Sequence, residues 1–459
     1  MSNSNKKSIT FCIILIAIVV LSASVSAFFR NRVNLVPATD SIQATTETKK
    51  QKTTKKQNSK FDYNLLAETL TEAQGKTFSE AMLKNAELSE ETLQLLQSNA
   101  EKGEISRSAF HHLTGYSVSA FIDKFGGNTN SRDMGNNGKN SFVLGFTGDI
   151  NFDETSYYVM VHALTKPNLV LDCIDENYQN EMKNADIMLI NNEFTYTDRG
   201  SPTPDKKYTF RAKPEYVHYL NDMGVDIVSL ANNHTYDYGY DSFVDTLSTL
   251  EGADIEYVGA GMNAEEANAA KFFIINGYRV AYIACSGVES PIKTPVATED
   301  KPGICGSYYD GAEKVADTIR KAKAESDYVI VYPHWGFENM TELSAGQREN
   351  SRLWVDAGAD AVIGNHSHCL QGMDYYKGSF IAYSLGNFWF NARNLYTGLL
   401  KLEISEEGIK PVFVAGTQYY RETSMLTDPA EQRKVYNLIE GYPTINGVKI
   451  DDNGVISPK

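Results

Sequence analysis

The stretch Val362-Ile363-Gly364-Asn365-His366-Ser367-His368 joins a β-branched apolar run to a glycine and two histidines. We expect a short buried strand to end at Ile363 and to open into a loop, because ligands of open α/β sheets collect at the carboxyl ends of strands. Gly364 permits the backbone to turn there, so that both imidazoles reach one pocket. Two surface loop histidines would explain an isolated pair more simply. The interpretation therefore depends on partners elsewhere in the chain.

Short apolar runs alternate with helical stretches from Ser141 onward, which predicts a layered α/β domain. The predicted buried strands are 142–146, 185–190, 225–230, 328–332 and 361–363, and helices are predicted at 240–250 and 345–357. Two closely spaced pairs of strands, 271–275 with 279–284 and 379–383 with 398–404, predict hairpins. They indicate a mixed sheet or two sheets packed together. A helix at 430–439 and a polar tail are expected after about Tyr420.

The amino terminus predicts export. Two lysines precede an apolar tract from Ile9 to Phe29, which fits either a membrane anchor or a signal peptide that is cleaved after Ala27. We favour a single-pass anchor that holds the main domain outside the cytoplasm, with secretion as the alternative. The predicted parts are an anchor at 1–30, a polar tether at 31–60, a helical module at 61–125, the main domain at 141–420 and a C-terminal extension at 421–459.

Charge and cysteine content exclude some classes of protein. The chain of 459 residues has a formal net charge of -15, so a nucleic-acid partner is not expected. Its five cysteines are too few to make a disulfide framework in a chain of this length.

Polar clusters occur where the predicted strands end. They are Thr147-Gly148-Asp149-Ile150-Asn151, Asn191-Asn192-Glu193, Ala231-Asn232-Asn233-His234, Tyr332-Pro333-His334-Trp335-Gly336 and the double histidine. Taken singly, each has an ordinary explanation: Asp149 as a helix cap, the Asn-Asn-Glu run as turn chemistry, His334 as a core histidine. Five clusters at the same kind of position in one sheet predict a common site.

The residue types in these clusters predict a metal site. Carboxylates, carboxamides and imidazoles together suit Mn, Fe or Zn better than Ca or Mg. The ligands outnumber those of one tetrahedral site, so we expect two divalent ions with Glu193 as a bridge. Two such ions lower the pKa of water and neutralise phosphoryl charge. Asn233 is predicted to bind a metal through its amide oxygen, and His234 to donate a proton to the leaving oxygen.

In combination, the motifs resemble the CapA family of poly-gamma-glutamate capsule-synthesis proteins, which is related to calcineurin-like metallophosphoesterases. The resemblance covers about residues 141–420. It rests on Gly148-Asp149, Asn192-Glu193, Asn232-Asn233-His234 with Asp237 and Gly239, His334-Trp335-Gly336, His366-x-His368 and Tyr383-Ser384-Leu385-Gly386-Asn387-Phe388. It implies a four-layered α/β/β/α metallophosphatase-like sandwich in an extracytoplasmic, membrane-anchored protein.

The resemblance also implies the metal ligands, which are Asp149, Asn151, Glu193, Asn233, His334, His366 and His368. Glu193 stands where the family's relatives have a bridging aspartate. Asn151 stands where a histidine is usual, so one of the two sites is expected to be weaker or differently occupied. His334 and His366 resemble ligands of one ion, and His368 resembles a ligand of the other.

Two residues are assigned to substrate binding, Arg211 and Asn232. Arg211 lies in Tyr208-Thr209-Phe210-Arg211-Ala212-Lys213-Pro214, which resembles a family stretch. Its guanidinium is suited to clamp a phosphate or a carboxylate with two hydrogen bonds. A surface ion pair is the alternative for this residue.

Three functions are consistent with these features. The first is a cell-surface protein that acts in the synthesis or export of a poly-gamma-glutamate-like polymer and carries a dinuclear phosphoester hydrolase site. The second is a surface phosphoesterase with an unrelated substrate. The third is a non-catalytic assembly or binding subunit among other polymer-synthesis proteins. Asn151 favours the third, whereas His234 favours an enzyme, because a purely structural metal site needs no proton donor.

Overall fold

The computed structural model describes residues 61–127, 130–288 and 293–459. The predicted membrane anchor and polar tether, residues 1–60, lie outside the described residues. Within these ranges, no helix is long and apolar enough to cross a membrane.

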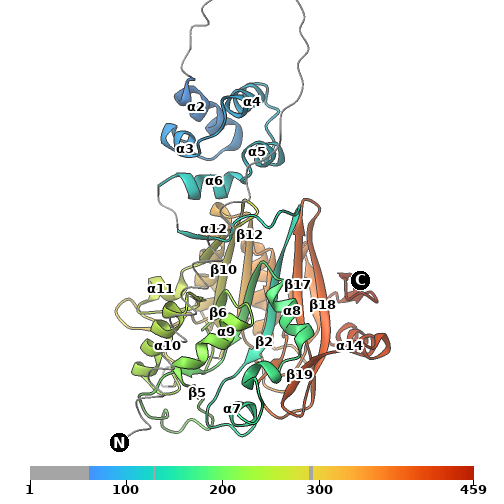
Figure 1. The fold of residues 1–459 in the computed structure, drawn as a ribbon. Helices are drawn as coiled ribbons and strands as arrows, with labels where there is room; N and C mark the ends of the chain where they lie inside the picture. The colour runs from blue at the N-terminus through green and yellow to red at the C-terminus, as the bar shows by residue number, and fades with distance from the viewer. Residues whose placement is uncertain (1–60, 128–129, 289–292) are drawn as a thin grey trace, which may run out of the picture. The chain divides into compact units, whose positions relative to one another are not determined.

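Two large β-sheets form the main domain (Figure 1). The first has seven strands in the order β1 (Ser131–Asp133), β9 (Lys271–Ile275), β10 (Tyr278–Ser286), β12 (Tyr328–His334), β13 (Ala361–Ile363), β15 (Ser379–Ala382) and β14 (Met373–Tyr376). The second has eight strands, in the order β19 (Glu422–Met425), β18 (Gly408–Tyr419), β17 (Leu395–Ser405), β2 (Ser141–Ile150), β3 (Ile187–Asn192), β6 (Ile227–Ser229) and β7 (Glu256–Val258), with β16 (Asn387–Trp389) also paired to β2. Both sheets mix parallel and antiparallel pairs, and the predicted α/β class is confirmed.

The two sheets pack face to face because alternate residues of their strands are apolar. Phe142, Leu144 and Phe146 of β2 belong to one buried cluster with residues of the other sheet. The ring of Phe146 lies 6.3 Å from that of Tyr332 and 6.4 Å from that of Tyr282. The main core of the domain therefore lies between the sheets.

Helices cover the outer faces of both sheets. The second sheet packs against α8 (Glu176–Lys183), α9 (His218–Asp222) and α10 (Tyr240–Gly252), and the first packs against α12 (Gly311–Glu325) and α13 (Ala345–Ala357). The smaller elements are α7 (Met160–Ala163), η1 (Leu169–Asp172), β4 (Thr195–Tyr196), β5 (Arg211–Ala212), η2 (Pro214–Val217), β8 (Ala260–Gly261), α11 (Ala264–Asn268) and β11 (Gly303–Ile304).

The five predicted buried strands are present as β2, β3, β6, β12 and β13. The predicted hairpin of 271–275 with 279–284 is confirmed, since β9 and β10 pair antiparallel. The predicted hairpin of 379–383 with 398–404 is wrong. Strand β15 pairs with β13 and β14, whereas β17 pairs with β2 and β18 in the other sheet. Strand β16 lies between them in the chain and crosses to the second sheet, which closeness in sequence does not reveal.

The chain after Tyr420 contributes to the core. Strand β19 extends the second sheet, and α14 (Pro429–Gly441) corresponds to the predicted helix. The polar tail expected after it is wrong, because β20 (Val448–Ile450) and β21 (Ile456–Pro458) form a hairpin. The side chains of Ile450 and Ile456 are buried in the same cluster as Phe142. Three-residue strands around the polar turn 451–454 are too short to show a clear apolar period.

A helical module precedes the sheets. It comprises α2 (Tyr63–Gln74), α3 (Glu80–Asn85), α4 (Glu90–Glu101), α5 (Arg107–Thr114) and α6 (Val118–Phe125), and a separate apolar cluster forms its core. Serine side chains cap α3, α4, α5 and α6 by accepting a hydrogen bond from a first-turn amide. The module also bonds to the main domain. The Ser117 amide donates to Gly277 O at 2.6 Å, and His111 Nε2 lies 2.9 Å from Asn276 O.

Two isoleucines of the C-terminal segment test its contribution to stability. The side chain of Ile450 is 3% exposed and that of Ile445 is 38% exposed. We expect Ile450→Ala to lower the free energy of unfolding by about 2–5 kcal/mol, because it leaves a cavity in the core. The matched change Ile445→Ala should cost much less. Urea-induced unfolding measures both, and equal effects would contradict the assignment of this segment to the core.

Candidate metal centre

The carboxyl ends of strands from both sheets meet at one place. Strands β2, β3 and β6 contribute from one sheet, and β12 and β13 contribute from the other. The residues brought together are Asp149, Glu193, Asn233, His234, His334, His366 and His368. The predicted convergence of the strand-end clusters is therefore present in the fold.

Two groups of three side chains have the geometry to hold metal ions. Glu193, His334 and His366 form one group, and Asp149, Glu193 and His368 form the other; in each group the ligand atoms lie within 4.8 Å of one another. Glu193 belongs to both groups. A shared carboxylate between two ligand sets is the arrangement expected of a dinuclear site.

The two carboxylates are deeply buried and have few partners for their charge. Asp149 and Glu193 are both 0% exposed, Glu193 Oε1 has no hydrogen-bond partner, and Asp149 Oδ2 lies 3.2 Å from His368 Nδ1. Burial, together with the neighbouring charge of Asp149, raises the pKa of Glu193 well above its usual range. A buried charge that is unpaired is costly. Divalent cations would give these oxygens partners, so the residues fit a metal site.

The imidazoles also have the form that binds metals. Burial lowers the pKa of His334 well below its usual range, and burial together with His368 lowers the pKa of His366 to about 3. Both rings are therefore neutral, and each keeps a nitrogen lone pair. His334 Nε2 lies 2.8 Å from Asn233 Oδ1 and 2.9 Å from His366 Nδ1.

His368 belongs to the second group. Its Nδ1 lies 3.2 Å from Asp149 Oδ2 and 2.8 Å from Asn387 Oδ1. Burial lowers the pKa of His368, but the hydrogen bond and charge of Asp149 outweigh burial, and the net shift is upward. Asn387 and Asp149 thus fix the orientation of this ring.

The loop that carries the two histidines has an uncommon backbone. His366 has φ of 89° and His368 has φ of 54°, in the left-handed region that non-glycine residues seldom adopt. Such conformations are found at functional sites. Gly364 is needed for space rather than for the expected turn, because a Cβ there would lie 2.2 Å from Trp335 Nε1 and from Tyr383 O.

His234 faces the ligand groups from the loop after β6. Its Nδ1 lies 2.6 Å from Asp237 Oδ2, and its Nε2 lies 3.8 Å from Glu193 Oε1. Asp237 is itself held by Lys206 and by the Phe210 amide. Asp237 therefore fixes the imidazole with Nε2 directed toward the centre. Burial lowers the pKa of His234 despite the charge of Asp237.

Two of the predicted site residues already have partners within the protein. Asn151 lines the cleft beside the centre, but its Oδ1 accepts a hydrogen bond from the Asp153 amide at 2.8 Å. Arg211 forms an ion pair with Glu154 at 3.0 Å and stacks on the Tyr238 ring, which fits the alternative of an ion pair.

Asn232 does not fit the predicted contact with substrate. Its side chain is 0% exposed, and its amide donates to Asn191 Oδ1 at 3.0 Å and to Asn192 O at 2.9 Å. Its Oδ1 accepts from the His234 amide at 3.0 Å. With these bonds satisfied below the surface, Asn232 positions the loop of His234.

Sequence reasoning did not assign Asn191 or Asn387 to the site. Asn191 Nδ2 lies 2.8 Å from Asp149 Oδ1 and 3.2 Å from Glu193 Oε2, so it donates to both carboxylates. Residues two apart on a strand share a face, and this spacing from Glu193 was the available signal. Asn387, the partner of His368, lies in the Tyr383 to Phe388 motif, which carries no charged group.

A cleft of about 730 Å³ lies beside the centre, lined in part by His234 and His368. Its other walls include three exposed tyrosines, Tyr157, Tyr158 and Tyr208, and the cations Lys207 and Arg393. The carboxylates Asp153 and Glu338 also line it, so the cleft offers a substrate aromatic surface and charged groups of both signs.

Comparison with known proteins gives one family. The family "Bacterial capsule synthesis protein PGA_cap" matches residues 143–392. The chain is 34% identical over 208 residues to "Capsule biosynthesis protein CapA" of Bacillus anthracis, which covers 44% of this chain and 50% of that protein. It is 32% identical over 208 residues to "PGA biosynthesis protein CapA" of Bacillus subtilis, which covers 44% of this chain and 53% of that protein.

The matched region thus spans about half the length of these curated relatives. Among solved structures, a 5'-nucleotidase from Candida albicans shares 13% identity, with a TM-score of 0.34 and coverage of 61% of this chain and 53% of that one. A similarity at that level carries no argument about activity.

Addition of Mn²⁺ or Zn²⁺ to metal-free protein should raise the temperature of thermal unfolding, because the ions bind the folded site. Metal analysis should find two ions per chain. His334→Ala should lose most of the stabilisation, whereas His112→Ala, at an exposed position of the module, should keep it. Scanning calorimetry measures the shift. An equal shift in both variants would place the binding elsewhere.

Proposed function

Because this chain belongs to the bacterial capsule synthesis protein family PGA_cap, we propose that it acts at the cell surface in the synthesis or export of an anionic polymer of the poly-gamma-glutamate kind. We further propose that its domain is a metallophosphatase-like α/β/β/α sandwich that hydrolyses a phosphoester. In this proposal residues 1–30 anchor the chain in the membrane. The printed names of the two Bacillus relatives support the polymer role.

One observation carries the catalytic part of the proposal. Asp149 and Glu193 are buried side by side, and Glu193 Oε1 lacks a hydrogen-bond partner. Glu193 is common to both candidate ligand groups. Two ionised carboxylates buried side by side need cations beyond the single His368 ring beside Asp149, so we assign the site to two divalent ions, of Mn, Fe or Zn.

The ligands divide between the two ions. Glu193, Asn233, His334 and His366 would hold one ion, and Asp149, Glu193 and His368 would hold the other. Asn151 is the expected further ligand of the second ion, through the free lone pair of its Oδ1. When bound, such ions act as Lewis acids and neutralise charge on a phosphoryl group.

The protein's own groups would supply positioning and proton transfer. His234 Nε2 is directed toward the site, and Asp237 holds the ring by its Nδ1. We assign His234, in its imidazolium form with Nδ1–H held by Asp237, the delivery of its Nε2 proton to the leaving oxygen. Lys207 and Arg393 of the cleft would attract the anionic substrate and orient it.

An assembly subunit without catalysis is the second candidate. Asn151 favours it, because it replaces the usual histidine and its amide oxygen is already bonded to the Asp153 backbone. In that case the metal centre would stabilise a surface that other polymer-synthesis proteins bind. A surface phosphoesterase with an unrelated substrate shares the catalytic assignment and differs only in the polymer role.

His234→Ala should lower kcat for a simple phosphodiester by about 10²–10⁴-fold, the usual contribution of general acid catalysis, and should leave the metal content unchanged. Asp237→Asn should cause a smaller loss. His218→Ala, at an exposed position outside the centre, is the matched control and should turn over normally. A fully metal-loaded protein without turnover on a broad panel of esters would contradict the catalytic assignment and favour the assembly subunit.

Complementation tests the polymer role. In a bacterium that makes poly-gamma-glutamate and lacks its own related protein, the full chain should restore polymer, and His112→Ala should do so equally. His334→Ala should fail, because it removes a ligand of the metal centre. If neither the parent protein nor any variant restores polymer, the polymer role is refuted. If His334→Ala restores polymer, the role does not need the metal centre.

A further inference from the structure

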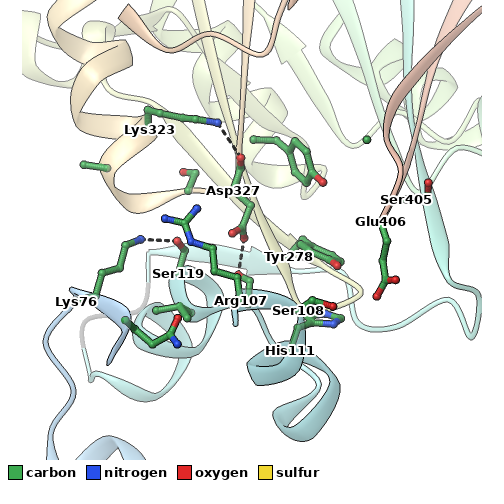
Figure 2. A pocket seen from close by; sticks show the side chains of 17 residues that line it. Lys76, Arg107, Ser108, His111, Ser119, Tyr278, Lys323, Asp327, Ser405 and Glu406 are labelled. Carbon is green, nitrogen blue, oxygen red and sulfur yellow. Dashed lines mark hydrogen bonds between the residues drawn. The ribbon is translucent and has the colours of Figure 1, made fainter. Parts of the chain in front are cut away.

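A second cavity, of about 720 Å³, lies between the helical module and the main domain (Figure 2). It is separate from the metal centre. Tyr328 at the start of β12 lines the cavity, whereas His334 at the end of the same strand lies in the metal centre. Seven residues of extended strand span roughly 20 Å.

Two cations of the module line this cavity with few partners. Lys76 Nζ donates to Ser119 Oγ at 2.6 Å. In the described part of the chain, Arg107 forms no hydrogen bond or ion pair through its guanidinium. Burial lowers the pKa of Lys76; the charge of Asp327 opposes the shift, and Arg107 adds to it. Figure 2 shows Lys76 and Arg107 approaching the cavity from the same side.

Two helix N-termini add to the positive potential. Helix α5 begins at Arg107 and α6 begins at Val118, and both first turns line the cavity. The first amides of a helix have no partner within it, and the helix dipole favours an anion there. Ser106 caps α5 and Ser117 caps α6, and each hydroxyl accepts from only one of these amides. Donors therefore remain for a ligand.

The wall from the main domain is formed by the end of α12 and the turn before β12, including Ala324 and Ser326. Ser326 is 6% exposed, and its Oγ is covered by protein, so this hydroxyl does not face the cavity.

The remaining charged groups of the cavity are already engaged or lie at its edge. Asp327 Oδ2 accepts from Ser117 Oγ and from the Arg279 amide. Lys323 pairs with Asp360 at 2.7 Å. Glu406 is exposed, and Glu406 and Asp327 are the acids of the lining that oppose an anion.

His111 is also engaged, because its ring stacks on Tyr278 at 4.4 Å and its Nε2 lies 2.9 Å from Asn276 O. The groups left for a ligand are Lys76, Arg107 and the helix amides. All of these can donate to an oxyanion.

We propose that this cavity binds the oxyanion group of a small molecule, a phosphate or a carboxylate. Lys76 and Arg107 neutralise its charge, and the first amides of α6 donate hydrogen bonds to it. The site does not depend on the metal centre or on its proposed activity.

Calorimetric titration of the full chain tests this site, in a His334→Ala background that removes binding to the metal centre. The probes are inorganic phosphate, pyrophosphate and a γ-linked triglutamate. At least one should bind once per chain. Lys76→Gln and Arg107→Gln should each weaken that binding about tenfold or more, as expected for lost charge-assisted hydrogen bonds.

The controls separate binding from folding. Lys102→Gln removes an exposed charge of the module outside the cavity and should bind as the parent does. Lys76→Arg should restore most of the affinity that Lys76→Gln loses. Binding of the phosphates alone identifies a phosphorylated ligand, and binding of triglutamate alone identifies a carboxylate ligand. Absence of binding by all three probes at millimolar concentration, or equal binding in Lys76→Gln and Lys102→Gln, would overturn the proposal.

Discussion

Two carboxylates buried next to one another are the constraint on which the rest of the centre depends. Asp149 and Glu193 lie at the ends of neighbouring parallel strands, away from solvent, and repel each other when both are ionised. Asn191 donates to both and relieves part of this cost. The remaining oxygens need cations. The neutral histidines around them, which supply lone pairs rather than charge, are the surroundings that such cations require.

The sandwich of two sheets explains how distant parts of the chain reach this centre. Acids come from one sheet and most imidazoles from the other, so neither sheet holds a complete site. The interface between the sheets is therefore part of the site's geometry. The Tyr332 hydroxyl donates across it to Thr147 O at 2.5 Å, near Asp149. Packing in the core and alignment of ligands are consequently linked, and damage to one should disturb the other.

Much of this arrangement could be predicted from sequence because strands with buried residues end in chemically distinctive clusters. The positions of Asp149, Glu193, His334 and the double histidine at strand ends were sufficient to predict one common site. The prediction placed these clusters in one sheet, whereas the structure divides them between two sheets. Partners that are not charged were harder to predict. Asn387 carries no signal of its own, and the burial of Asn232 depends on contacts made only in the fold. The sequence also did not show which of the two sheets residues 395–405 join. The alternation of apolar residues predicts which face of a strand is buried, but it does not predict which strand lies beside it.

The central claim is that Glu193 lies between two cations. Anomalous X-ray diffraction from crystals grown with Mn²⁺ tests it most directly. The account predicts two anomalous peaks about 3.5–4 Å apart, one beside His334 and His366 and one beside Asp149 and His368, with the Glu193 carboxylate touching both. A centre without any anomalous peak, or with peaks only at surface carboxylates, would contradict it.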